Sequence, residues 1–358
     1  MPSGASEVRR LEWRAMTALD PIVVDKFGGS VLRRPEDIAA AVAAVAGQQA
    51  EGLRPVVVVS AFEGVTDAIL SSASVLLPDG GAALREPRQD AASPLARETD
   101  RALATGEALS AALFALGLQA RGIRARSFSG AEAGIRTAAA HLGAEVRRVA
   151  PRLLRAALAD GLVPVVAGFQ GIGAHGELTT LGRGGTDLSA VVLAAALRAD
   201  RCELFKDTGG VMEADPHLVP AARFLPVVDA AQLELLAELG AEVVHPVAVR
   251  RARRARLRLV VRAVDAGRPM TEVQPRPTRG GAPAGLMLAV DRKERIARIS
   301  LVGPAAAMPE VLPIPAHGAG SFDEGGMRVV WAEVPLEQVA AAAQAVHASL
   351  MAPRPMNG

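Results

Sequence analysis

The sequence has no tyrosine, a single cysteine, Cys202, and an aromatic share of 3%. One cysteine excludes an intrachain disulfide and any metal site built from several cysteines, and it fits a reducing compartment. Scattered charges interrupt the first 20 residues, where a signal peptide would be apolar. No run approaches the roughly 18 apolar residues of a membrane span. We therefore expect a cytoplasmic protein that does not act at a membrane.

The chain also lacks an excess of charge of one sign. It has 40 Lys and Arg residues against 38 Asp and Glu residues, a formal net charge of +2 at pH 7. Nucleic acid is therefore not an expected partner, because proteins that bind polyanions present a clear basic excess. The 6 histidines are scattered without the spacing of metal ligands. Few of the basic residues are lysines, and these are Lys26, Lys206 and Lys293.

A chain of 358 residues is long enough for about two domains. From residue 21 to about 262, short β-branched runs alternate with longer segments of helical spacing, the pattern of an α/β protein with a mainly parallel sheet. Buried strands are predicted at 22–26, 56–60, 125–128, 163–168, 202–206 and 257–261. Helices are predicted at 35–49, 96–121, 145–160, 186–198 and 229–239, and a hairpin is predicted at 170–180.

Proline and glycine gather between residues 268 and 284, and this composition marks a linker. A smaller unit follows, with strands predicted at 286–290, 296–302 and 327–334 and a helix at 336–350. We therefore expect an N-terminal extension at 1–20, a first domain at 21–265, a linker at 266–284 and a small α+β domain at 285–352.

Two glycine turns are candidates for binding phosphate or carboxylate groups. In the first, Lys26 ends a strand and is followed by Gly28, Gly29 and Ser30, whose backbone N–H groups open a helix and can approach phosphate oxygens. The lysine precedes the glycines, so this is not the P-loop pattern. Glycines between a strand and a helix also occur for purely structural reasons.

The second turn holds Arg183 among three glycines, with Thr186 and Asp187 at the start of the next helix. As a structural feature, these two residues are helix caps. An arginine in such a turn also suits a carboxylate or phosphate, which it can bind with two hydrogen bonds. Lys206 ends a later predicted strand and Asp207 follows it, and ligands of open α/β sheets bind beyond the carboxyl ends of strands.

These motifs and several others stand in one order along the chain, at 26–30, 57–67, 106–110, 165–171, 179–187, 215–216 and 240–246. In that order they resemble the motifs of aspartate kinases, members of the amino acid kinase family, over residues 21 to 265. The resemblance implies a three-layer αβα sandwich with a mainly parallel sheet. It also implies ATP-dependent phosphorylation of the β-carboxylate of L-aspartate to 4-phospho-L-aspartate, the first step towards lysine, threonine and methionine.

The resemblance further implies residue roles. The catalytic residues would be Lys26, at the transferring phosphoryl group, and Asp187, which orients that lysine. The residues that bind aspartate would be Glu107, Arg183 and Thr186, although a lone glutamate on a helix is usually solvated surface. The residues that bind nucleotide would be Lys26, Gly28, Gly29, Ser30, Lys206, Asp207 and Asp215. Mg²⁺ is expected with ATP, held largely by phosphate oxygens and water.

The sequence departs from the family on the nucleotide side. Glu242 stands where the family has a lysine that contacts the phosphates, and a carboxylate there would repel ATP. Lys206 stands where threonine is usual, so one hypothesis is that Lys206, paired with Glu242, supplies the missing charge. A second hypothesis is a catalytically impaired protein that binds an amino acid or regulates a partner. Another amino acid or carboxylate kinase would also use the retained Arg183.

The C-terminal unit resembles part of one ACT domain. Aspartate kinases usually carry two such domains, which bind lysine or threonine as feedback inhibitors. Here a loop at 304–326 replaces the first helix of the domain, so we expect weak or absent feedback inhibition. The strand at 327–334 is expected to be free for pairing with a second copy, in a homodimer or a higher homo-oligomer.

Overall fold

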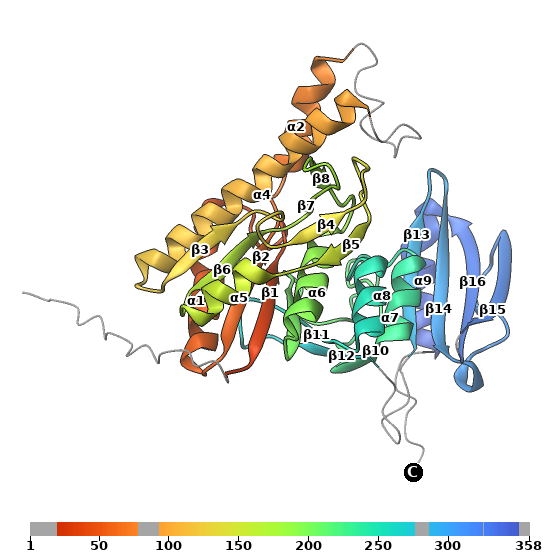
Figure 1. Ribbon diagram of the computed structural model, residues 1–358. Coiled ribbons are helices and arrows are strands. Elements are labelled where there is room, and N and C mark those ends of the chain that lie inside the picture. Colours follow the sequence, from red (N-terminus) through yellow and green to blue (C-terminus); the bar gives the residue numbers. More distant parts are fainter. Residues whose placement is uncertain (1–19, 78–92, 276–285, 325, 351–358) are drawn as a thin grey trace, which may run out of the picture.

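The computed structural model describes residues 20–77, 93–275, 286–324 and 326–350. Its larger part is built on an eight-stranded sheet in the order β10-β12-β11-β9-β1-β2-β6-β3 (Figure 1). Neighbouring strands are parallel except β11 and β12. The strands are β1 (Ile22–Phe27), β2 (Arg54–Val59), β3 (Ala125–Phe128), β6 (Val163–Ala167), β9 (Arg201–Phe205), β10 (Val227–Asp229), β11 (Arg258–Arg262) and β12 (Thr271–Gln274).

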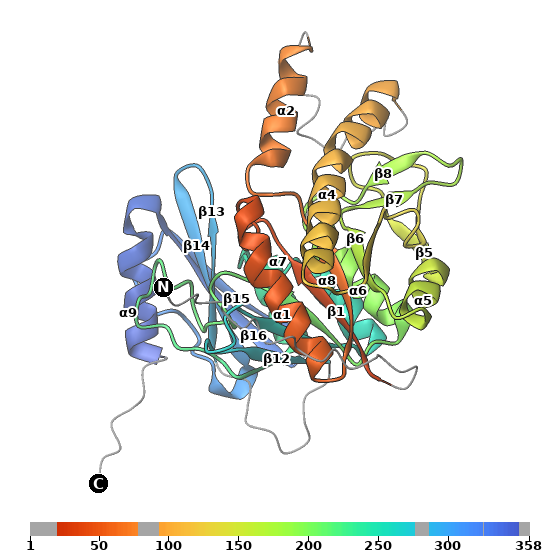
Figure 2. The same cartoon turned by 90° about the vertical axis from the view of Figure 1, so that its left-hand side faces the viewer.

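Apolar side chains cover both faces of this sheet, because successive residues of a strand point to opposite sides. In β2, Val57 and Val59 pack with α1 (Ile38–Ala50) and α4 (Pro94–Ala120), which lie side by side in Figure 2. Val56 and Val58 belong to the core on the other face. That core also contains residues of α5 (Arg152–Ala159), α6 (Gly185–Leu197), α7 (Ala230–Glu238) and α8 (Pro246–Ala255). The predicted three-layer αβα sandwich is confirmed.

A small sheet in the order β5-β4-β7-β8 lies near one end of α4. Its strands are β4 (Ile135–Thr137), β5 (Val146–Val149), β7 (Gln170–Ile172) and β8 (Leu178–Thr180), and the last two form the predicted hairpin. The predicted helix at 145–160 is wrong in its first part, where β5 forms. Pro151 explains the difference, because the residue before a proline is driven to extended backbone and α5 begins only at Arg152. The helix α2 (Val65–Val75) was not predicted, and none of its residues is buried.

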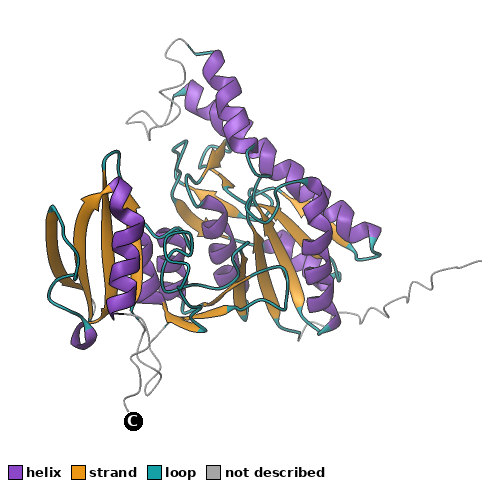
Figure 3. Cartoon of the chain, turned by 180° about the vertical axis from the view of Figure 1, so that it is seen from behind, coloured by secondary structure: helices purple, strands orange, loops and turns teal. Residues whose placement is uncertain are grey.

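The C-terminal unit is a four-stranded antiparallel sheet in the order β13-β14-β16-β15, with the helix α9 (Val339–Leu350) against it (Figure 3). Its strands are β13 (Met287–Arg292), β14 (Ile296–Pro304), β15 (Gly318–Glu324) and β16 (Met327–Pro335). The expected loop at 304–326 contains β15, and among its described residues no α-helix is present. The prediction that the strand at 327–334 is free is wrong, because β16 pairs with β14 on one side and β15 on the other.

Part of the predicted linker is a strand of the large sheet. Within 266–284, Thr271–Gln274 forms β12, which pairs with β10 and β11. Residues 276–285 lie outside the described residues, as do 1–19 of the predicted N-terminal extension and 351–352 at the end of the predicted second domain. Beyond β12 the two units share a core, because Leu218 and Val219, from the stretch between β9 and β10, pack with Leu288 of β13.

One helix among the described residues, α4, is long and apolar enough by length and composition to cross a membrane. Half of its most apolar stretch is buried, and Phe114 and Leu118 are fully covered in the core formed with α1 and the large sheet. The buried face of α4 therefore packs as that of a core helix, although Leu109 and Leu116 are exposed.

Candidate active site

The carboxyl ends of β1 and β9 bring two lysines to one buried aspartate. Lys26 Nζ lies 2.7 Å from Asp187 Oδ1, and Lys206 Nζ lies 3.9 Å from Asp187 Oδ2. Burial would raise the pKa of Asp187, but the charges of Lys26 and Lys206 outweigh it and lower the pKa to about 2. Asp187 is therefore ionised at neutral pH and holds Lys26 at the strand end. Two ammonium groups around one carboxylate suit an anionic ligand such as a phosphoryl group.

The first glycine turn gives the Lys26 side chain its space. A Cβ at Gly28 would lie 2.7 Å from Lys26 Nζ, so a larger residue there would displace the ammonium group. The carbonyl oxygen of Gly28 accepts hydrogen bonds from the backbone N–H groups of Val31 and Leu32, at 3.0 and 2.9 Å. Ser30, in the same turn, is exposed. The turn thus presents backbone and a hydroxyl residue next to the lysine.

The second glycine turn precedes α6 and requires glycine at Gly184. Its φ is 68°, in the left-handed region, and a Cβ there would lie 2.1 Å from the ring of His245. The backbone N–H of His245 donates to Asp187 Oδ2 at 3.4 Å. Arg183, next to Gly184, is exposed and makes no ion pair within the described part of the chain. Its guanidinium is therefore available to a ligand carboxylate.

Glu107 enters the site region from α4 with one oxygen unused. Its Oε1 accepts a hydrogen bond from the backbone N–H of Ala61, just beyond β2, at 3.0 Å, while its buried Oε2 has no hydrogen-bond partner in the part of the chain that the structure describes. Gly106 allows this approach, since a Cβ there would lie 2.8 Å from the Ala61 Cβ. Burial raises the pKa of Glu107 to about 7. A buried carboxylate of this kind can accept hydrogen bonds from a ligand ammonium group. Glu107 is therefore not a solvated surface residue, which a lone glutamate on a helix usually is.

Thr186 lies against the end of β6. Its Cγ2 would be 2.5 Å from a Cβ on Gly168, so this glycine lets the two elements meet. The next residue, Phe169, has a φ of 64°, which is costly for a residue other than glycine. Its backbone N–H donates to the Ser189 hydroxyl at 3.0 Å, and its carbonyl accepts from Leu181 at 2.8 Å. Phe169 and His245 lie within the motifs at 165–171 and 240–246, but neither has a role predicted from the sequence, because neither backbone strain nor a covered glycine turn shows in residue spacing.

A buried aspartate on α4, also missed in the sequence, anchors the loop beside the second glycine turn. Asp100 is 0% exposed. Its oxygens lie 2.6 Å from His141 Nδ1 and accept hydrogen bonds from the Leu142 backbone and the Thr180 hydroxyl. The loop reaches the turn itself, because a Cβ on Gly182 would lie 3.3 Å from Gly143. Asp100 therefore holds in place the loop that contacts the glycine turn containing Arg183.

The remaining predicted nucleotide residues are not all brought to Lys26. Asp207 is exposed, and its Oδ2 lies 3.7 Å from Nη2 of Arg33, which follows the first glycine turn. Asp215 lies in the stretch 211–225 and faces the C-terminal unit, with its Oδ2 3.8 Å from Arg292. Glu242 is exposed and makes no ion pair among the described residues. The predicted pair of Lys206 with Glu242 is therefore replaced by an approach of Lys206 to Asp187.

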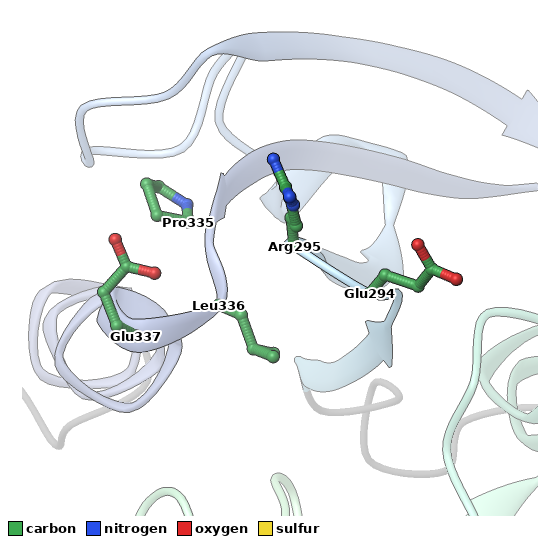
Figure 4. Close-up of a pocket in the computed structure, with 5 residues that line it drawn as sticks. All are labelled: Glu294, Arg295, Pro335, Leu336 and Glu337. Atoms are coloured by element: carbon green, nitrogen blue, oxygen red, sulfur yellow. The ribbon is translucent and has the colours of Figure 1, made fainter.

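A cavity of about 530 Å³ lies elsewhere, in the C-terminal unit, between the β13–β14 turn and the start of the last helical segment. Its lining includes Glu294, Arg295 and Glu337, whose charged ends point apart in Figure 4. It is separate from the group around Asp187. No cluster of three or more potential metal ligands occurs in the described parts of the chain.

Comparison of the sequence with known proteins points to one family. The model described as the amino acid kinase family matches residues 21–263. The chain is 40% identical over 253 residues to an aspartokinase of Thermus thermophilus, which covers 71% of this chain and 59% of that protein. It is 39% identical over 242 residues to aspartokinase 2 of Bacillus subtilis, and this match covers 68% of this chain and 56% of that protein. The match thus spans less than two thirds of the length of these curated relatives.

The fold of the chain is also similar to that of solved structures. The chain is similar to E. coli aspartokinase III in complex with aspartate and ADP, with a TM-score of 0.75 and 21% identity over 92% of this chain and 99% of that chain. It is also similar to the aspartate kinase from Synechocystis, with a TM-score of 0.59 and 31% identity over 94% of this chain and 57% of that chain.

Proposed function

This chain belongs to the amino acid kinase family, and on that premise we propose that it is an aspartate kinase, which transfers the γ-phosphoryl group of ATP to the β-carboxylate of L-aspartate. The observation that carries the proposal is the buried Lys26–Asp187 pair, 2.7 Å apart, at the carboxyl end of the sheet. Two groups suited to an amino acid accompany it: the exposed guanidinium of Arg183, and the Glu107 oxygen that has no partner among the described residues.

In this proposal each group acts on one part of the reactants. Arg183 binds the α-carboxylate of aspartate, and Glu107 with Thr186 holds its polar end, so that the β-carboxylate points at ATP. A β-carboxylate oxygen forms a bond to the γ-phosphorus as the bond from that phosphorus to the bridging oxygen breaks, and ADP leaves. The aspartate carboxylate is already deprotonated, so no general base is required. Lys26, oriented by Asp187, neutralises charge on the transferring group.

Lys206 supplies positive charge that the family lysine at position 242 would otherwise bring. Its Nζ lies 3.9 Å from Asp187, and its side chain is 20% exposed, so its field acts in a partly desolvated site. Burial lowers the pKa of Lys206, while Asp187 opposes the shift and Glu242 opposes it least. This geometry favours a working enzyme over the catalytically impaired alternative. A related carboxylate kinase stays the second candidate, because Arg183 would serve it equally.

Mg²⁺ belongs to the same proposal. The ion would be held mainly by the nucleotide phosphates and water. Bound there, it would neutralise phosphate charge, while the lysines act at the γ-phosphoryl group. We further propose a cytoplasmic enzyme at the start of lysine, threonine and methionine synthesis, forming homodimers or higher homo-oligomers, with little feedback inhibition by lysine or threonine.

Calorimetric titrations with partial substrates would test the aspartate site. Succinate lacks the ammonium group that Glu107 would bind, and 3-aminopropionate lacks the α-carboxylate that Arg183 would bind. We expect Arg183→Ala to weaken binding of L-aspartate by at least about tenfold and to leave the weak binding of 3-aminopropionate unchanged. Equal losses for the two ligands would contradict the role of Arg183. Tighter binding of another amino acid, such as L-glutamate, would favour the second candidate.

A further inference from the structure

The stretch after Lys206, residues 211–225, is closed at its base by one buried hydroxyl. The Thr271 hydroxyl, on β12, accepts a hydrogen bond from the Val211 backbone N–H at 2.7 Å and donates to the Leu225 carbonyl at 2.6 Å. Above this base, the Glu213 N–H donates to the Arg223 carbonyl at 3.0 Å. The 211–225 segment is thus an ordered hairpin-like loop, and Thr271 of the catalytic domain holds its two ends together.

Glu213 joins the two arms of this segment to the C-terminal unit. Its carboxylate is 3% exposed and receives three hydrogen bonds from the Arg223 guanidinium, at 3.0, 3.3 and 3.0 Å. The same carboxylate lies 2.7 Å from His347 Nε2, on α9, which is itself 5% exposed. Burial would raise the pKa of Glu213, but its hydrogen bonds to Arg223 and His347 outweigh this and lower it. A buried, ionised carboxylate therefore holds groups from both units.

Further contacts between α9, β13 and the segment surround this one. Gln344 Nε2 donates to the Leu218 carbonyl at 2.8 Å, and the Leu288 N–H donates to the Glu213 carbonyl at 2.7 Å. Leu218 and Val219 pack in the same apolar core as Val346. Movement of α9 would thus break apolar contacts and leave the Glu213 carboxylate without one of its donors, which is costly in a buried place.

We propose that Glu213 and His347 are positioning residues for the nucleotide: the C-terminal unit holds the 211–225 segment in the shape that binds Mg-ATP. The C-terminal unit is on this account a permanent part of the nucleotide site. The inference rests on the proposed kinase function, since the segment begins at Val211, shortly after Lys206, and carries Asp215, for which the resemblance implies nucleotide binding. It is separate from effector binding, because none of these contacts needs an effector.

The test compares His347→Ala and His347→Gln with Ser349→Ala, an exposed change on the same helix. In His347→Ala, we expect the KM for Mg-ATP to rise about tenfold, with the KM for aspartate and kcat at saturating ATP within about twofold of the wild type. His347→Gln keeps a side-chain donor for Glu213 and should recover most of the loss. Ser349→Ala should match the wild type.

Hydrogen exchange gives a readout that does not depend on catalysis. Backbone amides of 211–225 should exchange faster in His347→Ala than in Ser349→Ala, with the rest of the large sheet unchanged. If His347→Ala does not fold, Gln344→Ala removes a neighbouring donor from an exposed position and takes its place. Unchanged exchange, or equal rises in the KM values of both substrates, would overturn the inference. If the wild type binds no Mg-ATP, the proposed function fails, while faster exchange would still show that α9 holds the segment.

Discussion

Replacing Glu107 by glutamine should change the stability of the fold and the binding of aspartate in opposite directions. The carboxylate is 4% exposed, and one of its oxygens has no hydrogen-bond partner among the described residues, so its charge is poorly solvated. Glutamine keeps an oxygen that accepts from the Ala61 N–H and carries no charge. We therefore expect the Glu107→Gln variant to be more stable than the wild type at alkaline pH and to bind aspartate more weakly.

The size of the effect follows from the pKa of Glu107, which burial raises from 4.5 to about 7. A pKa that is higher in the folded state stabilises the fold most below pH 4.5, and this contribution is lost as the pH rises to about 7. Each pKa unit corresponds to about 1.4 kcal/mol. Linkage then predicts that the wild type loses about 2.5 kcal/mol more than Glu107→Gln between pH 5 and pH 8.5.

Urea unfolding of both proteins at these two pH values measures the difference directly, and Glu51→Gln, at an exposed position, serves as the control. Comparing the pH effect within each protein cancels any constant cost of the new amide group. If the difference in free energy of unfolding between the wild type and Glu107→Gln were the same at pH 5 and pH 8.5, it would refute the claim that Glu107 is a buried carboxylate with one unpaired oxygen. Bound aspartate should shrink the difference, because its ammonium group stabilises the ionised Glu107.

Three further changes test other parts of the structure. Asp25→Asn should raise the free energy of unfolding at pH 8 by at least about 1 kcal/mol, as measured by urea unfolding, because burial and a neighbouring glutamate on β9 raise the pKa of Asp25 and make its charge costly. Lys206→Ala should weaken Mg-ATP binding about tenfold by calorimetry, whereas the exposed Lys293→Ala should not. Gly184→Ala should cost at least about 2 kcal/mol of stability, since its φ is 68° and its Cβ would clash with an imidazole, whereas Gly47→Ala, in open helix, should stabilise slightly.

Each of these expectations has a contrary result. A loss of stability in Asp25→Asn would mean that its carboxylate makes a favourable interaction in the core. Full ATP affinity in Lys206→Ala would reject the idea that this lysine replaces the family lysine at position 242. A Gly184→Ala variant as stable as the wild type would show that the turn before α6 can relax.

Much of the large sheet was predictable, because its central strands contain short, mostly buried apolar runs bounded by glycine, proline or charge. The strand at 125–128 has the predicted bounds, and the other five predicted strands of this sheet differ by one or two residues at their ends. The short strands β4, β5, β10 and β12 were missed, since segments of three or four residues carry little periodicity and depend on tertiary pairing. The position of β16 inside its sheet also could not be predicted, because β15 is formed by a mostly exposed segment rich in glycine and acidic residues.

The site was partly predictable for a related reason. Glycine turns and charged residues at strand ends identified Lys26, Arg183 and Asp187, which occupy the same edge of the fold. Distances in space were not predictable, so the sequence paired Lys206 with Glu242 where the structure brings it to Asp187. Contacts between units were equally hidden: Glu213 and His347 are 134 residues apart in the chain.

The most direct test of the central claim is the product itself. The purified protein would be incubated with Mg-ATP and hydroxylamine, with and without L-aspartate, and assayed for aspartyl hydroxamate and ADP. The account predicts hydroxamate and ADP in equal amounts, dependent on aspartate and abolished in Lys26→Ala. Absence of hydroxamate from a folded protein that binds both ATP and aspartate would contradict it.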